Sequence, residues 1–156
     1  MQYFITGTDT DVGKTYVTRL LLEAWKRHGT LCAGYKPFCC GSRQDSIELL
    51  SGSSSELQLT LDEVNPQWFR AAASPFAAGL LENRKVDLDA AVAGFHQLKT
   101  RCDHLLVEGA GGWEVPLTDR ETIADFAQRL DLPVIVIVNN KLGALNHTLL
   151  TVRGIA

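Results

Sequence analysis

The chain has few of the features that mark membrane or secreted proteins. Its longest apolar stretch, near residues 132–138, is far too short to span a bilayer. The N-terminal residues form a strand pattern at once, without a positively charged segment and a long hydrophobic run, so no signal peptide is expected. There is no linker, repeat or low-complexity segment, and 156 residues are typical of one domain. We therefore expect a single domain over residues 1–156.

Metal-binding and nucleic-acid-binding patterns are also missing. The four histidines are scattered, which indicates no zinc site. The formal net charge is −3 and there is no basic run, which argues against a nucleic-acid-binding surface. The four cysteines show no Cys-x-x-Cys spacing, so we expect free thiols and a cytoplasmic location. These cysteines are Cys32, Cys39, Cys40 and Cys102.

The chain does contain short apolar strands that alternate with helical patterns. Strands are expected near residues 3–5, 31–35, 105–107 and 133–138. Helices are expected near residues 17–25, 45–50, 87–99 and 121–130, and from residue 145 onward. This order predicts an α/β fold in three layers, with a mostly parallel sheet and helices on both faces. The chain stops at the last helix, where such a sheet would return to a strand, so we expect a C-terminal truncation.

The most informative segment covers residues 7–15, between the first strand and the first helix. A strand, a glycine-bounded loop and Gly13-Lys14-Thr15 form the layout of a P-loop NTPase phosphate site. Lys14 is expected to reach the terminal phosphates and Thr15 to contact Mg²⁺, the alternative being a chance Gly-Lys-Thr helix start. Thr8 stands where the first glycine of the pattern belongs, so we expect the loop to bend at Gly7.

Three further polar residues follow strands or turns at the edge where ligands of such sheets bind. Glu108 comes after a buried strand and opens a glycine-rich segment, which suits Mg²⁺ or, alternatively, a tight turn with a surface glutamate. Lys36 could stabilise charge on a transferred phosphoryl group, or be a solvated surface lysine. Asp45 could cap a helix or supply a second carboxylate to Mg²⁺.

In combination these segments resemble the dethiobiotin synthetase family of P-loop NTPases. The resemblance is carried, in order along the chain, by residues 6–10, 12–15, 33–37, 64–66, 74–75, 106–113, 116–117, 141–143 and 146–147. Together they span nearly the whole chain. The glycine spacing of the phosphate loop, which departs from the general pattern, is this family's own form.

The resemblance implies an ATP- and Mg²⁺-dependent ligase of biotin biosynthesis. Such an enzyme takes 7,8-diaminononanoate, CO₂ and ATP, and passes through a carbamate and a carbamic-phosphoric anhydride. The products are dethiobiotin, ADP and phosphate. The resemblance also implies a homodimer with the diamine near the subunit interface.

The resemblance assigns roles to residues of this chain. Lys14 and Lys36 would be the catalytic cations, and Thr15, Asp45 and Glu108 would hold Mg²⁺. Nucleotide contacts are implied for Thr10, Asp11, Val12, Gly13, Lys14, Thr15, Asp45, Glu108, Gly109, Ala110 and Gly111. Substrate contacts are implied for Thr10, Lys36, Cys40, Gly143 and Asn146, of which the last two would serve the partner's site.

Two departures and two rival functions accompany this resemblance. Asp11 stands where the family often has glutamate, and Cys40, a weak donor, stands where a serine is common. One rival is a nucleotide switch of the ParA/MinD type, which has a lysine early in the loop where this chain has Asp9. The other is a non-catalytic relative that acts as a sensor or interaction domain.

Overall fold

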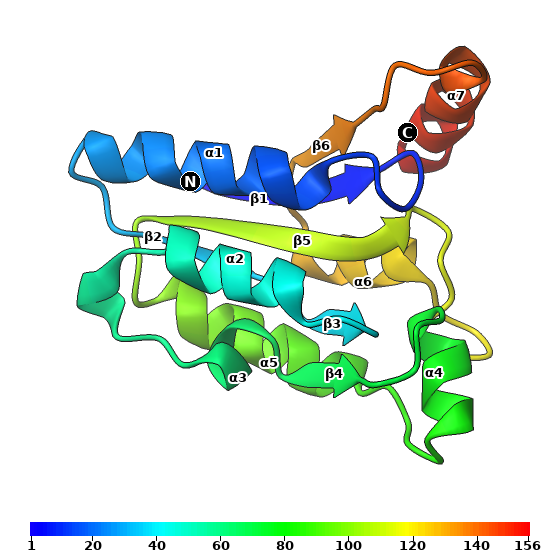
Figure 1. Ribbon diagram of the computed structural model, residues 1–156, viewed down its shortest axis with the longest axis horizontal. Coiled ribbons are helices and arrows are strands. Elements are labelled where there is room, and N and C mark those ends of the chain that lie inside the picture. The colour runs from blue at the N-terminus through cyan, green and yellow to red at the C-terminus, as the bar shows by residue number, and fades with distance from the viewer.

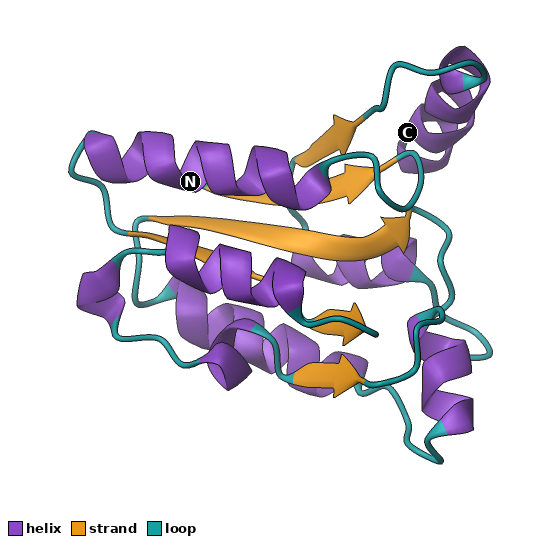
Figure 2. Cartoon of the chain, viewed as in Figure 1, coloured by secondary structure: helices purple, strands orange, loops and turns teal.

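A computed structural model describes residues 1–156 and contains a parallel four-stranded sheet (Figures 1 and 2). Its strands are β1 (Gln2–Gly7), β2 (Cys32–Tyr35), β5 (His104–Gly112) and β6 (Val134–Ile137). Their order across the sheet is β2-β5-β1-β6, and every neighbouring pair is parallel. The carboxyl ends of all four strands therefore point to one edge of the sheet.

Helices cover both faces of this sheet, which confirms the predicted three-layer α/β class (Figure 1). On one face lie α1 (Lys14–Arg27) and α2 (Gln44–Gly52). On the other face lie α5 (Leu88–Lys99) and α6 (Ile123–Leu130). Each of these helices buries residues along one side, as expected for a helix that packs on a sheet.

The side-chain alternation of the strands divides the core into two parts. Ile5 and Leu106 pack with Leu22 of α1. Their strand neighbours Phe4 and Val107 belong to the larger cluster on the α5 and α6 side. Because successive residues of a strand point to opposite faces, a sheet that is covered by helices on both faces needs an unbroken apolar run. That is why its strands lack a polar–apolar alternation.

A second, two-stranded parallel sheet was not expected from the sequence. It pairs β3 (Phe38–Cys40) with β4 (Gln67–Phe69). Along the chain, the two strands are separated by α2, a 3₁₀ turn (Ser55–Leu57) and α3 (Leu61–Val64). Strands of three residues are too short to show a period, so the pattern gave no signal for them.

Strand β5 continues further than the sequence indicated. We expected the strand to end before Glu108, but the glycine-rich segment that follows is part of β5. Gly112 pairs with Gly7 of β1 after a shift in register between Ile5 and Gly7. Glycines allow two backbones to approach this closely, so they extend the strand here and do not end it. Glu108 therefore lies inside a strand and not in a turn.

Two remaining helices lie at the carboxyl edge of the structure. They are α4 (Pro75–Leu81) and α7 (Ala144–Ile155). Helix α7 projects away from the sheet in Figure 1, and its Gly154 carbonyl accepts a hydrogen bond of 3.1 Å from the Trp113 indole. No helix combines the length and the apolar character needed to cross a membrane.

The N-terminal cap of α6 gives a test of the fold. Thr122 accepts a hydrogen bond from the Asp125 amide, and Asp125 accepts one of 2.7 Å from the Thr122 amide. Thr122→Ala removes half of this capping box, so unfolding in urea should need ~1 kcal/mol less free energy. The control, Thr100→Ala at the exposed end of α5, should change the stability by less than ~0.5 kcal/mol. Equal losses in the two variants would contradict the capping role.

Candidate functional site

The loop between β1 and α1 turns at two left-handed residues. Asp11 has a φ of 56° and Gly13 a φ of 98°. The predicted bend at Gly7 is wrong, because Gly7 does not have a positive φ. Its role is close approach: a Cβ at Gly7 would lie 2.5 Å from Val12 Cγ2 and 3.1 Å from Lys14 Nζ. The loop thus folds back over Gly7.

Lys14 directs its charge into this loop. Its side chain is buried, and Nζ donates a 2.9 Å hydrogen bond to the carbonyl of Asp9. Burial, followed by the neighbouring charge of Lys36, lowers the pKa of Lys14 to about 8. Gly13 begins α1 without a side-chain cap, so the first amides of the helix are free to bind an anion. The loop and the helix start therefore fit the phosphate site that the sequence predicts.

The carboxylate of Glu108 lies at the centre of the site and is fully buried. Its Oε1 accepts hydrogen bonds from Thr15 Oγ1 at 2.8 Å and from Lys36 Nζ at 2.6 Å. Its Oε2 accepts a hydrogen bond from Thr18 Oγ1 at 2.8 Å. The alternative of a surface glutamate in a tight turn is therefore wrong.

Lys36 follows β2 and is buried, so the alternative of a solvated surface lysine is wrong as well. Its Nζ lies 3.2 Å from Asp45 Oδ2 and 3.3 Å from the Gly109 carbonyl. Burial alone would lower the pKa of Lys36, but the charges of Glu108 and Asp45 outweigh it and raise the pKa. Asp45 lies in the first turn of α2, whose N-cap is Arg43, so Asp45 is not the cap.

A cavity of about 470 Å³ opens beside this cluster. Six of its lining residues are site residues predicted from the sequence, namely Thr10, Lys36, Cys40, Asp45, Ala110 and Gly111. Burial raises the pKa of Cys40 to about 11, so its thiol is neutral at ordinary pH. The volume suits a small ligand held by a few polar groups.

Two predicted substrate residues are not brought to this cavity. Gly143 begins α7 as its N-cap, and Asn146 lies in the first turn of the same helix. Both are exposed and neither lines the cavity. Within one chain the structure therefore leaves them apart from Lys36 and Glu108.

The sequence analysis gave no role to two buried residues of the site. Thr18 contacts Glu108, and its position three residues after Thr15, on the same side of α1, is the signal that could have found it. Asn65 donates a 2.8 Å hydrogen bond to the Lys36 carbonyl and accepts one from Arg43. Asn65 thus fixes the backbone that carries Lys36.

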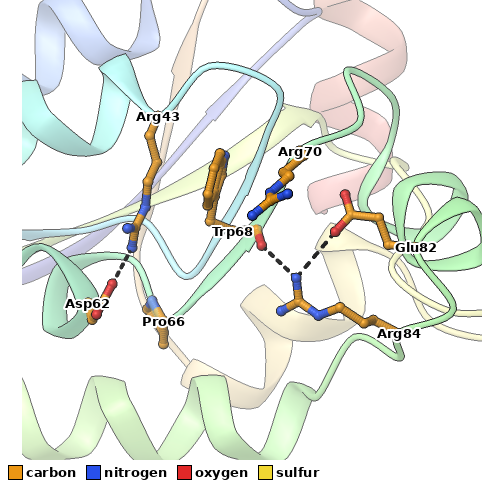
Figure 3. A pocket seen from close by; sticks show the side chains of 7 residues that line it. All are labelled: Arg43, Asp62, Pro66, Trp68, Arg70, Glu82 and Arg84. Carbon is orange, nitrogen blue, oxygen red and sulfur yellow. Dashed lines mark hydrogen bonds and ion pairs between the residues drawn. The ribbon is translucent and has the colours of Figure 1, made fainter.

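A separate hollow of about 520 Å³ lies beside β4 and contains three arginines (Figure 3). It is lined by Arg43, Asp62, Pro66, Trp68, Arg70, Glu82 and Arg84. Arg43 forms a 2.6 Å ion pair with Asp62, and Arg84 forms a 3.4 Å ion pair with Glu82. Since two of the three guanidinium groups already have carboxylate partners, this hollow is a weaker anion site than the loop.

The donor set around Glu108 fits Mg²⁺. Mg²⁺ takes oxygen ligands and is usually held by one or two carboxylates, with phosphate oxygens and water as the others. Glu108, Asp45 and the Thr15 hydroxyl offer such oxygens around the Lys36 ammonium. No group of three or more His, Cys, Asp or Glu side chains is gathered, so the protein alone does not supply a complete shell.

These features define a P-loop nucleotide-binding protein. The sheet is parallel, a loop leads from its first strand into a helix that begins with Lys14 and Thr15, and a buried acid lies on the neighbouring strand. Consistent with this class, the family model described as an AAA domain matches residues 1–155. Curated relatives narrow the class. The chain belongs to the ATP-dependent dethiobiotin synthetase family.

Three relatives of that name illustrate the similarity. The synthetase of Akkermansia muciniphila is 43% identical over 153 residues, which cover 98% of this chain and 71% of the relative. That of Yersinia pestis bv. Antiqua is 44% identical over 99% of this chain and 67% of its own length. That of Escherichia coli K12 is 42% identical over 97% of this chain and 70% of its own length. These relatives are synthetases and give no support to a nucleotide switch.

The close approach at Gly7 gives a test of the phosphate loop. Gly7→Ala places a methyl group against Val12 and Lys14, so ATP binding should weaken by about tenfold or more, or ~1.4 kcal/mol. The control is Gly29→Ala, since Gly29 has a φ of +73° but lies in open space at the end of α1. It should cost ~1 kcal/mol of stability and leave ATP affinity unchanged. Calorimetric titration with ATP measures the affinity of both variants, and urea unfolding measures their stability. Equal ATP affinities in the two variants would contradict the packing argument.

Proposed function

We propose that this chain catalyses the ATP-dependent formation of dethiobiotin from 7,8-diaminononanoate and CO₂. Membership of the synthetase family supports the proposal. The observation that carries it is the buried carboxylate of Glu108, which Thr15 of the phosphate loop and Lys36 of the cavity share. This contact joins a nucleotide site to a substrate-sized cavity, as a phosphoryl transfer to a small acceptor requires.

The reaction has three steps. One amine of the diamine adds to CO₂ and loses a proton, which gives a carbamate. The carbamate oxygen attacks the γ-phosphorus of ATP, and ADP leaves, which gives a carbamic-phosphoric anhydride. The second amine then attacks the carbamoyl carbon, phosphate leaves, and the cyclic urea of dethiobiotin forms.

The residues of the chain take the following proposed roles. Lys14 binds the terminal phosphates, and Lys36 faces the carbamate and the phosphoryl group, where its positive charge offsets developing negative charge. Thr15, Asp45 and Glu108 would hold Mg²⁺ together with phosphate oxygens, and the bound ion would offset negative charge on the triphosphate. Thr10 and Cys40 line the cavity on the diamine side. Backbone contacts to the nucleotide come from Asp11, Val12, Gly13, Gly109, Ala110 and Gly111.

We test the reaction with product formation in the wild-type protein and two lysine variants. ATP consumption should require both the diamine and bicarbonate, and mass spectrometry should detect dethiobiotin. Lys14→Ala should lower the rate by about a hundredfold or more, since a charge contact to the transferred group is lost. Lys85→Ala, at an exposed residue without an ion pair, is the control and should keep the wild-type rate.

Two outcomes would contradict the proposal. ATP turnover that is indifferent to the diamine would favour a nucleotide switch. ATP binding without any dethiobiotin would favour a non-catalytic sensor or interaction domain.

We also propose that two chains form a homodimer through α7. Leu142, Leu145, Leu149 and Leu150 are all more than half exposed on or next to this helix. A large exposed apolar surface of this kind marks an interaction site. In the dimer, Gly143 and Asn146 would contact the diamine in the partner's site.

A cytoplasmic location stays a prediction. The four cysteines are free thiols, which is typical of proteins in a reducing compartment.

The dimer is tested by a charge placed on α7. Leu149→Glu introduces a carboxylate into the proposed apolar contact, so the protein should sediment as a monomer at concentrations where the wild type is a dimer. Leu81→Glu, at an exposed leucine of α4, is the matched control and should remain dimeric. A monomeric wild-type protein, or a dimeric Leu149→Glu variant, would contradict the assignment.

A further inference from the structure

Two hydroxyl groups of α1 bind different oxygens of the Glu108 carboxylate. Thr15 Oγ1 lies 2.8 Å from Oε1, and Thr18 Oγ1 lies 2.8 Å from Oε2. Residues three apart lie on the same side of a helix, so one turn of α1 presents both hydroxyls to β5. Thr18 is fully buried, whereas Thr15 is only partly buried, next to the nucleotide loop.

The Thr18 hydroxyl donates its hydrogen to Glu108 and not to the backbone. The hydroxyl has a single hydrogen, and its oxygen lies 2.9 Å from the Lys14 carbonyl and 2.8 Å from Glu108 Oε2. A hydrogen bond to an ionised carboxylate is roughly twice as strong as one to a neutral acceptor. Lys36, 2.6 Å from the other oxygen, places a positive charge beside this carboxylate. The hydroxyl therefore donates to Oε2.

This bond distinguishes the two oxygens of Glu108. The last torsion of a glutamate side chain is broad and nearly two-fold, so packing alone does not fix the plane of the carboxylate. Thr15 and Lys36 both bind Oε1, and Thr18 is the only hydrogen-bond donor to Oε2. Without Thr18, a buried oxygen would lack a partner, and the carboxylate could lower its energy by rotating.

We infer that Thr18 is a positioning residue, whose hydroxyl holds the Glu108 carboxylate with Oε1 toward Thr15 and the nucleotide loop. The inference rests on the proposed function, in which Glu108 and Thr15 hold Mg²⁺. Thr18 itself contacts neither metal nor nucleotide. Its loss should weaken the contribution of Mg²⁺ to ATP binding and leave the phosphate loop intact.

The test compares ATP binding with and without Mg²⁺ in variants of one position. Thr18→Val keeps the shape and removes the hydroxyl. The Mg²⁺ concentration for half-maximal ATP binding should then rise about tenfold, or ~1.4 kcal/mol. Thr18→Ser keeps the hydroxyl and should behave as wild type. The affinity for ATP in the presence of EDTA should be the same in all three proteins. A general loss of structure would lower this affinity as well, so the comparison distinguishes it from the loss of the hydroxyl.

A further pair covers the case in which Thr18→Val does not fold. Thr18→Cys and Thr18→Ser have similar shapes, but a thiol is a weak donor, so only the cysteine variant should need more Mg²⁺. An unchanged Mg²⁺ requirement in Thr18→Val, or an equal increase in the serine variant, would overturn the inference.

The two hypotheses fail separately. A wild-type protein whose ATP binding ignores Mg²⁺ would overturn the role of Thr18. A wild-type protein that binds ATP with Mg²⁺ but makes no dethiobiotin would refute the proposed function and leave this role standing.

Discussion

The site depends on the ion pair and hydrogen bonds that the buried carboxylate of Glu108 forms with its neighbours. A buried carboxylate is costly unless its charge is paired and its oxygens have donors. Lys36 supplies the opposite charge, and two hydroxyls of α1 supply the other hydrogen bonds. The contact therefore ties β5, the end of β2 and the first turns of α1 together. Removing one partner would leave the others with an uncompensated buried group.

Sheet geometry explains why these groups meet. The strands β1, β2 and β5 are parallel neighbours, so their carboxyl ends lie at one edge. The glycines at that edge allow the phosphate loop and the end of β5 to come close, as the pairing of Gly7 with Gly112 shows. The same approach places Thr10 near Gly111, where a Cβ would lie 3.5 Å from the threonine hydroxyl. The phosphate loop and the cavity are consequently parts of one site.

Much of this arrangement could be predicted from the sequence. Fully apolar strands and helical periods indicated the layers, and the phosphate motif indicated Lys14 and Thr15. The parallel order then placed Lys36 and Glu108 at the same edge. These features depend on local pattern or on topology, which are both visible in a sequence.

Other features depend on contacts between distant segments. The three-residue strands β3 and β4 form because they pair with each other, and β5 extends through its glycines because β1 lies beside them. Asp11 adopts a left-handed conformation that nothing in its own identity requires. The bond from Thr18 to Glu108 joins residues 90 positions apart, so only the fold reveals it.

The central claim is that Glu108 links the nucleotide site to the Lys36 cavity. A crystal structure of the protein with Mg²⁺ and a non-hydrolysable ATP analogue tests it most directly. We predict the triphosphate on residues 7–15, with Lys14 at its terminal phosphates. Thr15 and Glu108 should hold the metal. A nucleotide bound elsewhere, or a metal held without Thr15 and Glu108, would contradict the claim.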